Sequence, residues 1–201
     1  MDQCSRTSDW LFVIRINATI FKTTLDKKEK REIMKHLYIV RHGLTELNKA
    51  NVFAGVTETP LTKEGRGQAK DAGKHIAGLN IDLIVSSPLG RAIETAQIIA
   101  KEIGYPKDKI AINYYFAERN FGRFEGTTYS PDLNLDGFSD VESFDELLER
   151  AHLGMRWINK QAAENILIVS HGSFTRAIRE LHLPHIDRSV KVANAEVVQL
   201  I

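Results

Sequence analysis

The feature of this sequence that most constrains its fold is an apolar run that ends abruptly in polar residues. Tyr38–Val40 is aromatic and β-branched, which is typical of a buried parallel strand, and Arg41, His42 and Gly43 follow directly. In open α/β sheets, ligands bind at the carboxyl ends of the strands, where the next loop and helix present N–H groups to anions. Arg41 could bind a phosphate there and His42 could act as a nucleophile near neutral pH. The alternative is a strand end with a surface arginine and a capping histidine.

Similar apolar runs recur along the chain and alternate with helical patterns. Further strands are expected at residues 81–85, 110–112, 166–169 and 195–201, and helices at about 63–78, 88–103, 144–158 and 173–181. Thr62 is the expected N-cap of the first of these helices, and Ser143 with Glu146 has the spacing of a capping box. Strands that alternate with helices predict an α/β fold with three layers, α/β/α, around a mostly parallel central sheet.

Composition excludes several classes of protein. The chain has 201 residues, which is enough for one domain with a sizeable core, and its formal net charge is only +1. A balanced charge predicts neither a nucleic acid nor a membrane as partner. Because the single cysteine, Cys4, cannot form an internal disulfide, we expect a cytoplasmic protein. The sequence leaves the oligomeric state open.

Residues 1–33 differ from the remainder of the chain. Their apolar run, 10–14, is interrupted by Arg15 and is far shorter than the ~20 residues of a membrane span. We expect residues 1–33 to be an N-terminal extension that is poorly ordered or not native, with Met34 as the natural start. A segment that binds a partner is the alternative. The domain is then expected to span residues 34–201.

Four motifs occur in a fixed order along this domain. They are Arg-His-Gly-x-Thr-x-x-Asn at 41–48, Ser-Ser-Pro-Leu-Gly-Arg-Ala at 86–92, Glu-Arg-x-x-Gly-x-x-Glu-Gly at 118–126 and Ser-His-Gly at 170–172. Together they resemble the histidine phosphatase superfamily, which includes the phosphoglycerate mutases, and the resemblance covers Met34 to Ile201. It implies a phosphoglycerate mutase-like fold.

The resemblance also implies the roles of the site residues. His42 would be the residue that is phosphorylated, with its other ring nitrogen held by a backbone carbonyl, and Glu118 would be the proton donor. The other expected catalytic residues, which form the phosphate pocket, are Arg41, Arg91 and His171. The expected substrate-binding residues are Asn48, Gly55, Arg119 and Gly172. Glu125 is a competing carboxylate that the resemblance places in a structural position.

The differences between this sequence and the phosphoglycerate mutases favour a hydrolase over a mutase. Mutases carry an arginine-rich insertion after the Glu-Arg motif, whereas Thr127–Glu142 contains no arginine and is short. We therefore predict a phosphomonoester hydrolase of the alpha-ribazole phosphatase-like type that acts on a small-molecule phosphate ester. A cofactor-dependent phosphoglycerate mutase is one alternative, and a catalytically inactive binding or regulatory module is another. No cofactor is expected, and no metal site either, since His182 and His185 lack a third ligand nearby in the sequence.

Overall fold

The structure is a computed structural model that describes residues 36–130, 133–182 and 191–201. The expected extension at 1–33, the proposed start at Met34, His185 and the side chain of His182 lie outside the part of the chain that the structure describes. Among the described residues, no helix combines the length and the apolar character that crossing a membrane requires.

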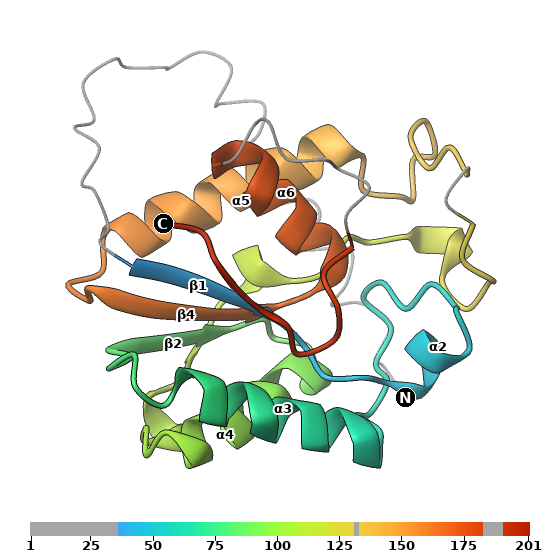
Figure 1. Cartoon of the computed structure of the whole chain (residues 1–201). Coiled ribbons are helices and arrows are strands. Elements are labelled where there is room, and N and C mark those ends of the chain that lie inside the picture. Colours follow the sequence, from blue (N-terminus) through green and yellow to red (C-terminus); the bar gives the residue numbers. More distant parts are fainter. Residues whose placement is uncertain (1–35, 131–132, 183–190) are drawn as a thin grey trace, which may run out of the picture. The chain divides into compact units, whose positions relative to one another are not determined.

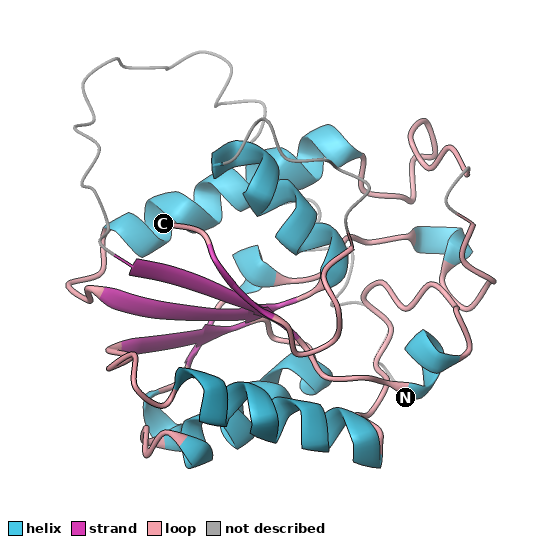
Figure 2. Ribbon diagram, viewed as in Figure 1, coloured by secondary structure: helices cyan, strands magenta, loops and turns pink. Residues whose placement is uncertain are grey.

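A central sheet of five strands organises the described chain. The strands are β1 (His36–Arg41), β2 (Leu83–Ser86), β3 (Ala111–Ile112), β4 (Asn165–Ser170) and β5 (Val197–Gln199). Their order across the sheet is β3-β2-β4-β1-β5, and only β5 runs antiparallel to its neighbour. The predicted three-layer fold with a mostly parallel sheet is therefore confirmed (Figure 2).

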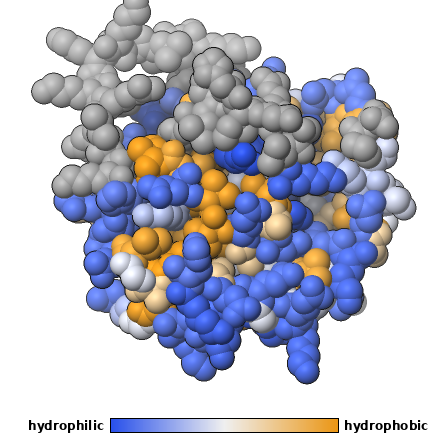
Figure 3. Space-filling model, in the orientation of Figure 1, coloured by the Kyte–Doolittle hydropathy of each residue, from blue (hydrophilic) through white to orange (hydrophobic). Residues whose placement is uncertain are grey.

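Helices cover both faces of this sheet. The α-helices are α2 (Glu46–Lys49), α3 (Lys63–Ile76), α4 (Gly90–Glu102), α5 (Phe144–Asn159) and α6 (Gly172–His182), and the 3₁₀ turns are η1 (Lys107–Lys109), η2 (Tyr114–Phe116) and η3 (Gly122–Phe124). Helices α3 and α4 pack on one face, and α5 and α6 on the other (Figure 1). The outward surface of α3 is mostly hydrophilic (Figure 3).

Alternation of side chains along the strands divides the core in two. In β1, Leu37 and Ile39 are buried against α5 and α6, whereas Tyr38 and Val40 are buried against α3 and α4. This is the period of two that a pleated strand imposes. A strand of this kind is covered on both faces, which explains why its sequence is apolar at each position from Leu37 to Val40.

The expected helix caps are present. The Thr62 hydroxyl accepts a hydrogen bond from Gly65 N at 2.8 Å, and Ser143 and Glu146 form the capping box at the start of α5. These caps satisfy N–H groups that the first helical turn leaves without partners. The sequence-based helix boundaries therefore agree with the structure to within about two residues.

Two glycines bring the start of α3 against the loop that follows β1. A Cβ at Gly43 would collide with the carbonyl oxygen of Gly65, and a Cβ at Gly65 would collide with the carbonyl oxygen of Leu44. Gly43 N also donates to the Thr95 hydroxyl at 3.1 Å. The backbone next to His42 is thus held by direct contact with α3 and α4.

We expect Gly65→Ala to lower the free energy of unfolding by about 1–3 kcal/mol, since the added methyl group has no room. The matched control is Gly67→Ala, in the same helix, where a Cβ would meet nothing within 4 Å. That change should be stabilising by about 0.5–1 kcal/mol, because alanine is the better helix former. Urea unfolding of both variants measures the difference, and an equal effect at the two positions would contradict the close contact.

Candidate active site

The register of the sheet brings two histidine motifs side by side. Arg41, the last residue of β1, is paired with Ser170, the last residue of β4, and His42 N donates to Ser170 O at 2.9 Å. His42 and His171 therefore leave neighbouring parallel strands at the same level. Their ring centroids lie 5.1 Å apart, and both side chains are buried.

The hydrogen bonds of His42 determine which ring nitrogen can react. Its Nδ1 lies 2.8 Å from the carbonyl oxygen of Gly43. Because a carbonyl only accepts, Nδ1 carries the proton and Nε2 keeps its lone pair. The expected backbone carbonyl is thus in place.

Burial and positive neighbours keep both histidines neutral. Burial lowers the pKa of His42 well below its usual value, and the guanidinium groups of Arg91 and Arg41 lower it further. The pKa of His171 is also lowered, first by burial and then by Arg91. A neutral imidazole is the form that attacks phosphorus.

Arg91 comes from the first turn of α4 and is almost completely buried. Its two terminal nitrogens donate to Thr57 O at 2.9 Å and Gly55 O at 2.6 Å. Gly55 accordingly contributes a carbonyl that orients Arg91, and its expected contact with substrate stays a prediction. This loop is in turn held by Glu125, whose carboxylate accepts from Val56 N and Thr57 N.

Three buried nitrogens of the site have no protein partner among the described residues. They are Arg41 Nε, Arg91 Nε and His171 Nδ1. Buried donors are normally paired, so such atoms indicate a place where a solvent molecule or an anion is bound. A phosphate carries enough acceptor oxygens to satisfy all three.

Glu118 is held at the N-terminus of α6. Its Oε1 accepts hydrogen bonds from Ser173 N and Phe174 N, both at 3.2 Å, and from Arg119 N at 2.9 Å. The segment that carries Glu118 is fixed from behind by the fully buried Arg150. This guanidinium donates to the carbonyls of residues 115, 117 and 118 and pairs with Glu142 at 2.7 Å.

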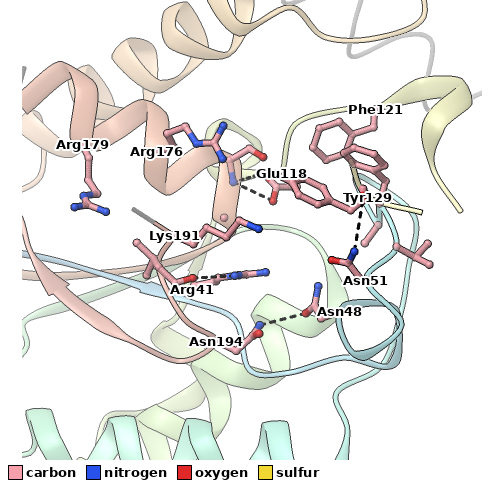
Figure 4. A pocket seen from close by; sticks show the side chains of 16 residues that line it. Arg41, Asn48, Asn51, Glu118, Phe121, Tyr129, Arg176, Arg179, Lys191 and Asn194 are labelled. Carbon is pink, nitrogen blue, oxygen red and sulfur yellow. Dashed lines mark hydrogen bonds between the residues drawn. The ribbon is translucent and has the colours of Figure 1, made fainter. Parts of the chain in front are cut away.

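A cavity of about 280 Å³ is lined by part of the predicted site (Figure 4). Of the predicted site residues, Arg41, Asn48, Glu118 and Gly172 line it. Arg91, His42 and His171 are not part of the lining and are buried.

Arg119 lies elsewhere. Its guanidinium donates to Asp136 at 2.7 Å and to the carbonyl oxygen of Glu142 at 2.6 Å, and it is not part of the cavity wall. Both of these partners belong to the segment before α5, so Arg119 holds that segment. Substrate binding by Arg119 stays a prediction.

Sequence reasoning missed residues that support the site. The Ser87 hydroxyl lies 2.7 Å from His171 Nε2, and Asn194 donates to His42 O at 3.0 Å and to the Asn48 side chain at 3.2 Å. Ser87 stands inside one of the four motifs, so its place after a strand could have revealed it. Asn194 and Arg150 carry no such signal.

The lowered pKa values of the two histidines predict how stability depends on pH. Below about pH 6.5 the unfolded chain binds a proton at each histidine and the folded chain does not, so acidification favours unfolding. We expect the free energy of unfolding to fall from pH 7.5 to pH 5.5 by up to about 1.4 kcal/mol per pH unit for each histidine. Urea titrations in phosphate-free buffer measure this slope. The double variant His42→Asn/His171→Asn should flatten it, and an unchanged slope would refute the assignment.

Comparison with known proteins gives the family. A model of the histidine phosphatase superfamily (branch 1) matches residues 37–200. The phosphatase PhoE of Bacillus subtilis (strain 168) is 35% identical over 153 residues, which cover 72% of this chain and 76% of PhoE. A 2,3-bisphosphoglycerate-dependent phosphoglycerate mutase of Parvibaculum lavamentivorans is 39% identical over 92 residues, which cover 45% of this chain and 44% of the mutase. The solved structure of Bacillus stearothermophilus YhfR is 26% identical and aligns with a TM-score of 0.72 over 82% of this chain and 89% of YhfR.

These likenesses agree with the motifs and with the fold. They confirm the resemblance read from the four motifs, the mutase-like architecture and the prediction of a phosphatase enzyme. With a family model matched from residue 37 to residue 200, the chain belongs to the histidine phosphatase superfamily.

Proposed function

We propose that this enzyme hydrolyses a small phosphorylated metabolite through a phosphohistidine formed on His42. The observation that carries the proposal is the set of buried, unpaired nitrogens of Arg41, Arg91 and His171 beside a histidine whose Nε2 lone pair is available. Phosphoryl transfer requires a nucleophile and positive charge around the phosphate oxygens, and little else from the protein.

The reaction proceeds in two steps. His42 Nε2 attacks phosphorus, the bond from phosphorus to the alcohol oxygen breaks, and Glu118 protonates that oxygen as it leaves. Water then attacks the phosphohistidine while Glu118 accepts its proton, which releases inorganic phosphate and restores His42. Arg41, Arg91 and His171 donate to the phosphate oxygens in both steps, and Asn48 and Gly172 line the cavity together with Arg41.

Hydrolysis is favoured over mutase chemistry by two observations. The segment Thr127–Glu142 has no arginine to grip the carboxylate of phosphoglycerate. The likeness to the phosphatase PhoE also extends over most of both chains, whereas the likeness to the mutase covers less than half of each. We therefore expect phosphate release to exceed interconversion of 3- and 2-phosphoglycerate, without a requirement for 2,3-bisphosphoglycerate.

The phosphohistidine can be trapped. Rapid quenching of the enzyme with a ³²P-labelled substrate should yield a phosphoenzyme that acid destroys and alkali preserves. His42→Ala should abolish it, while His75→Ala, which removes an exposed histidine of α3, should leave it unchanged. Label that persists in His42→Ala would refute the assignment of the nucleophile, and the absence of both label and turnover in the wild type would favour a binding module.

Glu118→Gln tests the general acid, because the amide oxygen can still accept from Ser173 N and Phe174 N. An alkoxide leaves poorly without a proton, so the burst of phosphoenzyme formation from an alkyl phosphate should slow by about 10²–10⁴-fold. The burst with p-nitrophenyl phosphate should slow far less, since p-nitrophenolate leaves readily. Equal slowing for both substrates, measured by quenched flow, would mean that Glu118 positions the phosphate instead of protonating the leaving group.

A further inference from the structure

The cavity is lined by more positively charged side chains than are needed to balance the charge of one phosphate group. Its charged lining residues are Arg41, Arg176, Arg179 and Lys191 on the positive side and Glu118 alone on the negative side. A phosphate ester has a charge close to −2 near neutral pH, which Arg41 and the buried Arg91 match. Of the other cations in the lining, Arg176 and Lys191 are the candidates to bind another part of the ligand.

Arg176 is presented to the cavity by the geometry of α6. Ser173, Arg176 and Arg179 follow one another at intervals of three residues, so they share one face of the helix, and all three line the cavity (Figure 4). Ala177 and Ile178 are buried in the core on the other side of the helix. Arg176 is exposed and makes no ion pair with a carboxylate in the described part of the chain.

Lys191 reaches the same space from the C-terminal segment. Its ammonium nitrogen lies 4.6 Å from the ring centroid of Tyr129, which holds it by a cation–π contact. Tyr129 packs on Phe53 at 5.0 Å, and Phe53 packs on Phe121 at 4.8 Å. This row of aromatic rings therefore supports Lys191 at the edge of the cavity.

We infer that Arg176 and Lys191 form a second anion subsite, so that the preferred substrates are phosphate esters whose organic part also carries an acidic group. This inference rests on the proposed function and adds the chemical class of the substrate. The cavity of about 280 Å³ suits a small metabolite, in which the acidic group and the scissile phosphate are a few bonds apart. The acidic group is a carboxylate or a second phosphate, since either accepts hydrogen bonds from both cations.

Matched substrates test the subsite in the full-length enzyme. In the carboxylate arm, 3-phosphoglycerate is compared with glycerol 3-phosphate, in which a neutral CH₂OH group replaces the carboxylate. In the phosphate arm, glucose 1,6-bisphosphate is compared with glucose 6-phosphate. Release of inorganic phosphate gives kcat and KM, and we expect kcat/KM for the acidic member of at least one pair to be about tenfold higher.

Variants that lack the positive charge of Arg176 or Lys191 test whether these two residues cause the preference for the acidic substrates. Arg176→Met and Lys191→Met should each reduce the preference by several-fold through KM, and the double variant should abolish it. Turnover of the neutral member and of p-nitrophenyl phosphate should stay within about twofold, because neither contact touches the reacting phosphate. Lys101→Met, which removes an exposed lysine of α4 outside the cavity, is the control and should change nothing.

The outcomes separate this inference from the proposed function. Hydrolysis of both members of each pair at equal kcat/KM would overturn the subsite and leave the phosphatase proposal intact. Equal losses for acidic and neutral substrates in the Met variants would also overturn it, since a structural defect acts on both. No phosphate release from any of these esters, p-nitrophenyl phosphate included, would overturn the proposed function and the subsite with it.

Discussion

The candidate site depends on one constraint, the in-register parallel pairing of β1, β4 and β2. Arg41 is opposite Ser170, and Ser86 is opposite Val169, so three motif-bearing turns leave the sheet at the same edge. A shift of one residue in any of these strands would turn its side chains to the opposite face and bury apolar residues in the wrong layer. The continuous apolar sequences of β1 and β4, which must fill both halves of the core, thereby also place His42 beside His171.

The segment that carries Glu118 lies outside the sheet and is held in place by the buried Arg150. Between residues 113 and 126 the chain has only short 3₁₀ turns, yet Glu118 must face the cavity. Arg150 supplies the order by donating to three carbonyls of this segment while it pairs with Glu142. Removing one partner of such a buried pair leaves the other charge uncompensated, at a typical cost of about 3–5 kcal/mol. The position of Glu118 is therefore coupled to the packing of α5 against the core.

The positive charges of the site have two effects: they attract phosphate, and they lower the pKa of His42. The guanidinium groups of Arg41 and Arg91 are suited to bind phosphate oxygens, and the same charges lower the pKa of His42 and keep it unprotonated. Burial is the largest cause of this shift, and it also strengthens the attraction of both arginines for an anion. Phosphate binding and activation of the nucleophile thus have one physical origin.

The sequence by itself determined the main strands and helices with the caps of two helices, the order of the motifs and, through that order, the family and the residues proposed for the site. These features are local, because strand and helix periodicity and capping spacing involve residues a few positions apart. Only the tertiary structure decided the strand order, the turning of Arg119 toward Asp136, and the parts played by Ser87, Arg150 and Asn194. Those residues act through hydrogen bonds that span dozens of residues or more, 84 for Ser87 with His171 and 152 for Asn194 with His42. Local sequence patterns do not predict such contacts, because these hydrogen bonds form only when the sheet and its covering helices have assembled.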